Sequence, residues 1–162
     1  LEQAGANMIL IGTNTMHKVA DQVRESVGVP LVHIAEATAE ELRGQGIQKV
    51  ALLGTKYTMQ QHFYRDKLEE AGLTVLVPGD DEMEQINQII FQELCLGIQS
   101  DHSREFIQSV IDVLGKEGAE GVILGCTELG LLLQQEGSPL PLFDTTRIHA
   151  DAAVRMALDA DD

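Results

Sequence analysis

The chain has 162 residues, of which 44% are hydrophobic and only 4% aromatic, and 26 acidic residues outnumber 11 basic ones for a formal charge of −15. This apolar content is too high for a disordered segment, and no apolar run approaches the roughly 18–20 residues that a membrane-spanning helix needs. The acidic balance argues against nucleic acid or an anionic membrane as a partner, because both bind through clustered Lys and Arg. We therefore expect a soluble globular protein with one domain or two very small ones.

The cysteines and histidines do not form the pattern of a disulfide framework or a metal site. Cys95 and Cys126 are the only cysteines, no CxxC is present, and no signal peptide is recognisable. This usage suits a reducing compartment, so a cytoplasmic protein is expected. The histidines lack HExxH or any other paired ligand spacing, which predicts that no metal is bound.

Short apolar runs alternate along the chain with longer amphipathic stretches, a pattern typical of a parallel sheet covered by helices. In chain order, the predicted strands are residues 8–12, 31–34, 50–54, 74–77, 122–125 and 142–143. The main helices, in which apolar side chains recur with helical spacing, are predicted over residues 15–27, 81–96 and 103–114. Gly28, Gly72 and Gly118 stand where a left-handed residue would end a helix. The fold class is therefore α/β.

An internal repeat gives the clearest information on domain organisation. Two pairs of segments match in the same order, residues 4–15 with 117–128 and residues 29–32 with 140–143. In this alignment Gly12 coincides with Gly125, and Thr13 coincides with Cys126. Two matches with similar spacing indicate two related lobes with parallel sheets.

The two copies of the repeat differ in what precedes them. About seventy residues with further strands and helices stand before the second copy, whereas the first copy begins near Leu1. If the lobes are equivalent, roughly seventy residues are missing ahead of Leu1. We therefore expect one whole lobe and the back half of another, with the first lobe truncated at its N-terminus.

Ligands of open parallel sheets gather at the carboxyl ends of strands, where helix N-termini present unpaired N–H groups. Three predicted strands end in turns of small and hydroxyl-bearing residues, at 12–15, 54–58 and 125–128. If the lobes face each other about a pseudo-dyad, Thr13 and Cys126 approach a bound molecule from opposite sides. This geometry suits inversion of a stereocentre, because one group can remove a proton from one face while the other returns a proton to the opposite face.

Each of these residues also has a purely structural interpretation. A single cysteine after an apolar strand is more often a small buried residue than a nucleophile. Cys95, in the helical stretch 91–96, is expected to be a core residue for the same reason. His17 is expected to be solvated or hydrogen-bonded rather than a base. The coincidence of Thr13 and Cys126 with the repeat favours the catalytic interpretation.

The segments Gly12-Thr13-Asn14-Thr15-Met16-His17 and Gly125-Cys126-Thr127-Glu128 resemble the two signature segments of the cofactor-independent aspartate/glutamate racemase superfamily. The usual form of that superfamily has cysteine at both catalytic positions, as Cys-Asn-Thr-Ala-His and Gly-Cys-Thr-Glu. The resemblance extends over essentially the whole chain, through residues 50–59, 86–94 and 143–149. It is closest to the subgroup specific for L-aspartate and L-glutamate, which likewise has Thr at the first position and Cys at the second.

The resemblance implies two similar α/β lobes with the active site between them, commonly in a homodimer, and neither pyridoxal phosphate nor metal as a cofactor. It divides the chain into the back half of lobe 1 (residues 1–47), a complete lobe 2 (48–145) and a C-terminal helix that returns to lobe 1 (146–162). Thr13 and Cys126 would be the catalytic pair. Asn14, Thr15 and Thr127 would hold the carboxylate and ammonium groups of aspartate or glutamate, and Thr58 and Glu128 would be further substrate-binding residues. Glutamate racemases tend to have His at the position of Glu128.

The threonine at the first catalytic position determines the expected mechanism. A thiol has a reference pKa of about 8.5 and is easily poised as a thiolate near a helix N-terminus, so Cys126 can act as a base. Threonine is not plausible as an alkoxide, but its hydroxyl can donate a proton directly or through water. We expect Cys126 to take the α-proton from the L-amino acid and Thr13 to assist reprotonation, which gives the D-enantiomer.

Two other functions are compatible with the same residues. Decarboxylases of the superfamily keep only the second cysteine, so Cys126 could instead protonate the enediolate left after CO2 departs. A ligand-binding protein without turnover is the third alternative, because Thr13 replaces the first cysteine and the front half of the first lobe is expected to be missing, which could leave the 162-residue chain itself inactive. The sequence does not rank aspartate against glutamate as the substrate.

Overall fold

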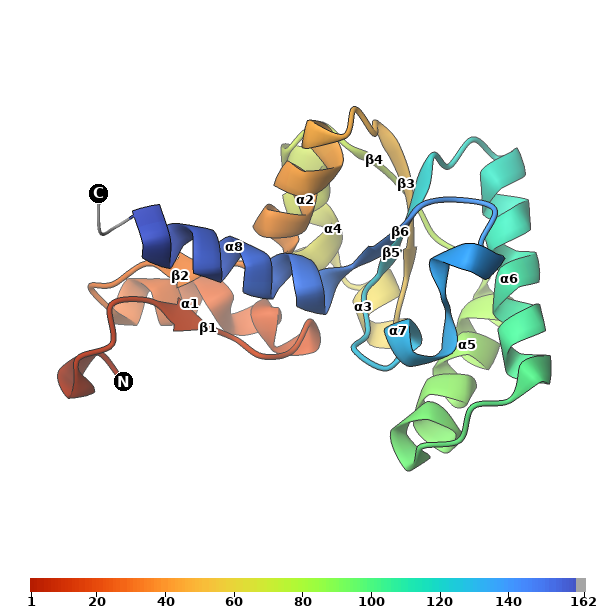
Figure 1. Cartoon of the computed structure of the whole chain (residues 1–162), viewed down its shortest axis with the longest axis horizontal. Helices are drawn as coiled ribbons and strands as arrows, with labels where there is room; N and C mark the ends of the chain where they lie inside the picture. The colour runs from red at the N-terminus through yellow and green to blue at the C-terminus, as the bar shows by residue number, and fades with distance from the viewer. Residues whose placement is uncertain (160–162) are drawn as a thin grey trace.

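The computed structural model describes residues 1–159 and contains two β-sheets surrounded by helices (Figure 1). A two-stranded sheet pairs β1 (Ile9–Leu10) with β2 (Leu31–Val32). A four-stranded sheet has the order β4-β3-β5-β6, with strands β3 (Lys49–Leu53), β4 (Thr74–Leu76), β5 (Gly121–Leu124) and β6 (Leu142–Asp144). All of these strand pairs are parallel, which confirms the expected α/β fold class.

The helices connect the strands and cover the sheets. The α-helices are α1 (Ala20–Ser26), α2 (Ile34–Gly44), α3 (Lys56–Gln60), α4 (His62–Glu70), α5 (Asp80–Gln92), α6 (Asp101–Lys116), α7 (Leu129–Leu132) and α8 (Thr145–Asp159). Short 3₁₀ helices are η1 (Glu2–Ala4), η2 (Thr15–Val19), η3 (Leu94–Leu96) and η4 (Gln135–Gly137).

The core of the four-stranded sheet follows the alternation of side chains along β3. Ala51 and Leu53 face α5, α6 and α7, whereas Val50 and Leu52 face α2 and α4, because successive side chains of a strand point to opposite faces. Figure 1 shows these two groups of helices on opposite sides of the sheet. Both faces are therefore buried, which explains why the strands of this sheet are continuously apolar.

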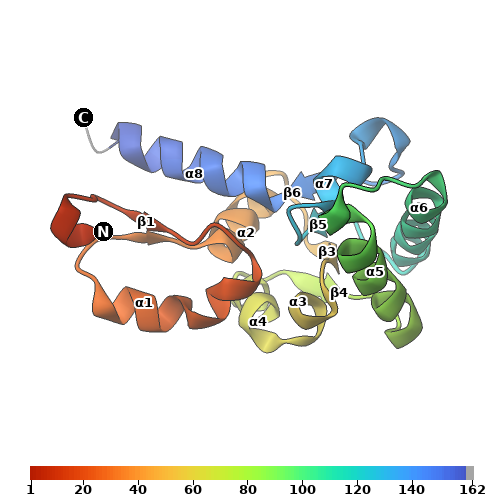
Figure 2. The ribbon, with the colours of Figure 1, turned by 90° about the horizontal axis from the view of Figure 1, so that it is seen from below.

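The two-stranded sheet lies between α1 and α8 (Figure 2). Ile9 and Leu31 pack with Ala20 of α1 in a small core that is separate from the cores of the larger sheet. On the other side, α8 contacts β2 and packs along α2. The C-terminal helix thus joins the two sheets although it follows the last strand of the larger one.

The internal repeat is confirmed by equivalent backbone pairing in the two sheets. The N–H of Ile9 donates to the carbonyl of Pro30 at 2.8 Å, and the N–H of Val122 donates to the carbonyl of Pro141 at 2.8 Å. The strand register that follows is the same in β1–β2 as in β5–β6. The matched sequence segments therefore form matched β-α-β units, with Thr13 after β1 and Cys126 after β5.

The helix that follows each β-α-β unit packs against the other sheet. α8 follows β6 and packs on β2, while α2 follows β2 and packs into the core of the four-stranded sheet. The two helices also begin alike: His33 Nδ1 accepts the N–H of Ala35 at 3.1 Å, and Asp144 Oδ1 accepts the N–H of Thr146 at 2.9 Å. The boundary expected between lobe 1 and lobe 2, after residue 47, therefore differs from the packing, because the helix over residues 34–44 contributes to the core of the larger sheet.

Several element boundaries differ from the sequence expectation. The strand expected over residues 8–12 has only two residues in β-pairing, and the helix expected over residues 81–96 ends at Gln92 and continues as η3. Gly72 and Gly118 have the expected positive φ. Gly28 does not, and its N–H instead bonds to both carboxylate oxygens of Glu2 at 3.1 Å.

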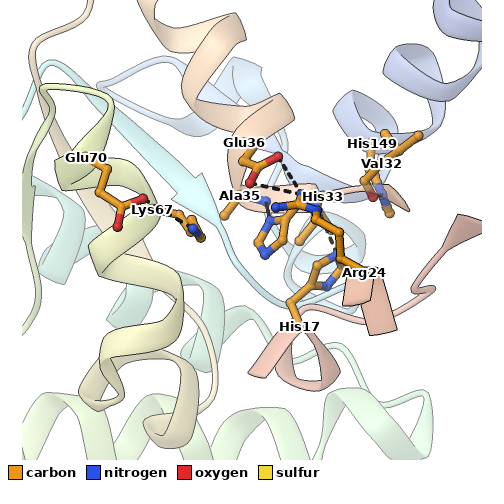
Figure 3. A network of polar contacts seen from close by, with 10 residues as sticks. His17, Arg24, Val32, His33, Ala35, Glu36, Lys67, Glu70 and His149 are labelled. Atoms are coloured by element: carbon orange, nitrogen blue, oxygen red, sulfur yellow. Dashed lines mark hydrogen bonds and ion pairs between the residues drawn. The ribbon is translucent and has the colours of Figure 1, made fainter. Parts of the chain in front are cut away.

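Three histidines from different elements meet beside the start of α2 (Figure 3). The ring of His17 on η2 lies 4.5 Å from the ring of His33 and 5.6 Å from the ring of His149 on α8, between centroids. Burial lowers the pKa of His33 to about 3, with further contributions from His17, Arg24, Lys67 and His149. The imidazole of His33 is therefore neutral in the folded protein and free to cap α2.

This burial predicts that acid destabilises the fold before the carboxylates titrate. Since the unfolded chain binds a proton at His33 near pH 6.5 and the folded chain only near pH 3, the stability is complete above pH 6.5 and falls below it. Between pH 6.5 and 4.5 the expected loss in the free energy of unfolding is on the order of 2–3 kcal/mol. Urea unfolding at a series of pH values measures this slope.

The matched variant for this prediction is His33→Asn. Asparagine keeps an acceptor at the N-cap of α2 but does not titrate. It should flatten the dependence of stability on pH below 6.5. An unchanged slope in His33→Asn would show that the buried imidazole is not its source.

Candidate active site

A cavity of about 240 Å³ lies at the carboxyl ends of β1, β3 and β5. The three strand-end turns that the sequence singled out all contribute to it, and α5 and η3 close one side. The lining residues are Gly12, Thr13, Asn14, Thr15, Thr55, Ile90, Phe91, Cys95, Gly125, Cys126, Thr127 and Glu128. The cavity therefore lies between the two sheets, where ligands of parallel α/β proteins bind.

Thr13 and Cys126 reach this cavity from different lobes. Thr13 follows β1 of the two-stranded sheet, and Cys126 follows β5 of the four-stranded sheet. The two turns are equivalent in the repeat and carry different functional groups at the matched position. A hydroxyl and a thiol thus line one cavity.

Cys126 carries a protonated thiol at neutral pH. Its Sγ–H donates to Glu128 Oε2 at 2.9 Å, and the hydroxyl of Thr127 donates to the same oxygen at 2.6 Å. Burial and the Glu128 carboxylate raise the pKa of Cys126 to about 12. The Cys126 hydrogen bond, followed by that of Thr127, lowers the pKa of Glu128. An anion faces the thiol and burial disfavours its charge, so the thiol must lose its proton before it can act as a base.

Replacing Glu128 with glutamine should lower the pKa of Cys126 by about one unit or more, since it removes the negative charge beside the thiol. The pKa should stay above the ordinary thiol value, because burial remains the largest cause of the shift. The rate of Cys126 alkylation as a function of pH, in a Cys95→Ser background, measures this pKa.

The control for the Glu128→Gln experiment is Thr127→Val, which removes a hydroxyl from the same carboxylate and keeps its charge. It should not make Cys126 more reactive. A Glu128→Gln protein whose alkylation profile matches the parent would mean that the carboxylate does not control the thiol.

Asn14 has a buried amide whose orientation is fixed from the other lobe. Its Nδ2 donates to the Thr145 hydroxyl at 3.0 Å, and that hydroxyl donates its own proton to the carbonyl of Leu124 at 2.8 Å. The Asn14 side chain cannot flip without losing this bond, because the Thr145 hydroxyl has no second proton. Asn14 Oδ1 has no partner among the described residues although it is buried. It is therefore an unused acceptor on a residue that lines the cavity.

Three threonine hydroxyls form a chain along the edge of the cavity. Thr58 Oγ1 lies 3.4 Å from Thr15 Oγ1 and 3.1 Å from Thr55 Oγ1. Thr15 and Thr55 line the cavity, whereas Thr58 is fully buried behind them. Thr58 therefore supports the hydroxyls that face the cavity in this state and does not itself line it.

Cys95 is exposed on η3 and lines the cavity, so the expectation that it is a core residue is wrong. The apolar face of α5 ends at Gln92, and the chain then turns through η3 to the left-handed Gly97. This turn brings Cys95 to the cavity beside Ile90 and Phe91. The three side chains form the apolar wall of the cavity.

Sequence reasoning gave no role to Thr145, Thr55, Ile90 or Phe91. The hydroxyl-rich turn at 54–58 pointed to the neighbourhood of Thr55, and the motif at residues 143–149 contained Thr145. Neither pattern reveals a hydrogen bond between residues far apart in the chain.

Residues 1–159 contain no group of three or more His, Cys, Asp or Glu side chains arranged to hold a metal ion. No helix in the same range combines the length and apolar character needed to cross a membrane.

Solved structures resemble this chain throughout its length. A candidate Asp/Glu racemase from Yersinia pestis is 51% identical with a TM-score of 0.93, and covers 97% of this chain and 69% of its own. An aspartate racemase homologue from Pyrococcus horikoshii OT3 is 45% identical with a TM-score of 0.89, and covers 96% of this chain and 69% of its own.

Sequence comparison gives the same result. The broad specificity amino-acid racemase RacX of Bacillus subtilis (strain 168) is 27% identical over 157 residues, which are 95% of this chain and 66% of the relative. The chain thus spans about two thirds of the length of these relatives. The Asp/Glu/Hydantoin racemase family matches residues 1–153. The chain therefore belongs to the Asp/Glu/Hydantoin racemase family.

Proposed function

We propose that the protein carrying this chain interconverts L- and D-aspartate or glutamate without a cofactor, by proton transfer on both faces of the substrate α-carbon. The observation that supports this most directly is that Thr13 and Cys126 occupy equivalent positions of the two repeats and line one cavity. A pair of groups that can exchange protons from opposite lobes is what inversion at carbon requires.

In the L-to-D direction, Cys126 removes the α-proton. Its thiol first loses a proton to solvent, because the resting group is protonated, and the thiolate then takes the α-proton as the C–H electron pair moves into the adjacent carboxylate. The resulting carbanion takes a proton from the Thr13 hydroxyl on the other face, directly or through a water. Solvent returns a proton to Thr13. One proton leaves the α-carbon and one arrives, so the reaction is balanced.

The substrate groups have matching partners in the cavity. Asn14 Oδ1, the buried acceptor without a partner, suits the α-ammonium group, and the Glu128 carboxylate adds a negative charge for it. The hydroxyl of Thr15 can donate to the α-carboxylate, and the hydroxyl of Thr127 can do so once it rotates away from Glu128 Oε2. The ammonium of a bound substrate would also offset the negative charge that Glu128 presents to Cys126, which favours the thiolate when substrate is present.

Energetics constrain any difference between the two directions. Enantiomers have equal free energy, so kcat/KM must be the same for the L- and D-substrates at every pH. Because the reactive form has lost one proton from a thiol of raised pKa, kcat/KM should rise about tenfold per pH unit below that pKa in both directions.

Chiral chromatography of L- and D-aspartate and of L- and D-glutamate after incubation with the protein tests this function. Appearance of the opposite enantiomer supports it. Loss of CO2 from malonates without racemisation would point instead to a decarboxylase that uses Cys126 alone. Binding of amino acids by calorimetry, with neither reaction, would identify a non-catalytic homologue.

A further inference from the structure

His17 is a buried residue of η2, with 3% of its surface exposed, and it follows Thr13 by four positions in the chain. Its Nδ1 lies 2.8 Å from the carbonyl oxygen of Thr13, and its Nε2 lies 3.1 Å from the backbone nitrogen of Ile34. Both ring nitrogens are therefore used, and the residue is hydrogen-bonded rather than solvated.

These two contacts define the state of the ring. The Ile34 N–H can only donate, so Nε2 of His17 is an acceptor and carries no proton. Nδ1 must then carry the proton of the neutral imidazole and donate it to the Thr13 carbonyl. Burial lowers the pKa of His17, the hydrogen bond to Thr13 opposes this shift, and the neighbouring His149 adds to the lowering.

The two contacts also connect the lobes. Ile34 is the first residue of α2, which packs with Val50, Leu52 and Ile123 in the core of the four-stranded sheet. Ile123 belongs to β5, the strand that leads to Cys126. His17 thus joins the backbone of the Thr13 turn, on one lobe, to a helix anchored in the lobe that carries Cys126.

The surroundings of His17 hold its ring in this position. His33 contacts the ring edge-on at 4.5 Å, and His149 does so at 5.6 Å while bonding through Nε2 to the Val32 carbonyl at 2.7 Å. Figure 3 shows these rings together, with the ion pair of Arg24 and Glu36 beside them. One of these rings belongs to the N-cap residue of α2 and the other to α8.

We propose that His17 is a positioning residue for the Thr13 half of the reaction: it sets the Thr13 turn relative to Cys126 through the Nδ1–H bond to the Thr13 carbonyl. The inference rests on the proposed two-sided proton transfer. His17 touches neither the substrate nor the reacting atoms, since it does not line the cavity. Loss of its bond to Thr13 should therefore affect proton transfer on the Thr13 face alone.

A matched pair of substitutions separates the two contacts of His17. Asparagine places its amide nitrogen near the position of Nδ1, so His17→Asn keeps a donor for the Thr13 carbonyl and loses the acceptor for Ile34. Glutamine places its amide near the position of Nε2, so His17→Gln keeps the acceptor for Ile34 and loses the donor for Thr13.

Two rates on L-aspartate and L-glutamate in deuterated water report on the two faces. Exchange of the α-hydrogen with retained configuration needs Cys126 alone, whereas racemisation also needs Thr13. His17→Gln should lower racemisation on the order of 10- to 100-fold, as small misplacements of a catalytic group do, with exchange much less affected. His17→Asn keeps the bond to Thr13 but loses the anchor at Ile34, so it should lower racemisation less than His17→Gln does, again with exchange much less affected. A merely structural role would lower both rates together in both variants, and that result would overturn the inference.

A spectroscopic measurement on the unsubstituted protein covers the case in which a variant fails to fold. Nitrogen NMR of His17 should show a protonated Nδ1 and an unprotonated Nε2 at neutral pH. The opposite tautomer would overturn the inference.

Thr13→Val separates this inference from the proposed function, because failure of Thr13→Val to change the ratio of racemisation to exchange contradicts two-sided transfer. If Thr13→Val changes the ratio and His17→Gln does not, only the role of His17 is wrong.

Discussion

A Cys126→Ser variant is expected to lose α-hydrogen exchange and racemisation together, by about 10³-fold or more, because a serine hydroxyl replaces the thiol proposed as the base. The substitution keeps the size of the side chain and a donor for Glu128, whose carboxylate the thiol contacts at 2.9 Å. Proton NMR of the substrate in deuterated water measures exchange, and chiral chromatography measures racemisation.

Cys95 provides the matched control for this substitution. It lines the same cavity but is exposed on η3 and has no part in the proposed proton transfer. Cys95→Ser should therefore retain both rates within a few-fold of the parent, which is an order-of-magnitude expectation for a side chain outside the reaction. Normal exchange in Cys126→Ser would refute the assignment of Cys126 as the base.

Thr13→Val should separate the two reactions that Cys126→Ser abolishes together. Valine keeps the branched shape of threonine and removes the hydroxyl, so Cys126 can still take the α-proton and return a solvent-derived one to the same face. Racemisation is expected to fall about 10²- to 10³-fold, while exchange on the L-enantiomer persists. The same two assays measure both quantities.

Thr13→Ser retains the hydroxyl and should keep racemisation near the parent rate. This variant distinguishes the loss of a proton donor from a change in local packing. Parallel loss of exchange and racemisation in Thr13→Val, or full racemisation without the hydroxyl, would contradict the role of Thr13.

The repeat in the sequence predicted the β-α-β organisation, and the hydroxyl-rich turns after three predicted strands indicated the place of the cavity. It did not predict that α2 and α8 exchange sheets. An amphipathic pattern shows that one face of a helix is buried, but it does not show which sheet covers that face. The reciprocal packing depends on contacts between residues far apart, such as Ile34 with the strands of the larger sheet.

The chemistry of the site was predictable only in part. The positions of Thr13 and Cys126 followed from the repeat, but the protonation state of Cys126 did not, because it depends on burial and on the direction of the Glu128 carboxylate. The orientation of Asn14 depends in the same way on Thr145, which is 131 positions away in the chain. Residue types and spacing carry no information on either contact.

The most direct test of two-sided proton transfer is the deuterium content of both enantiomers early in the reaction of L-aspartate or L-glutamate in deuterated water. If Cys126 removes the proton and Thr13 delivers one from solvent, the D-product carries deuterium at the α-carbon from the first turnovers. A D-product that retains the original α-hydrogen would show that one group returns the same proton, and would contradict transfer between Cys126 and Thr13.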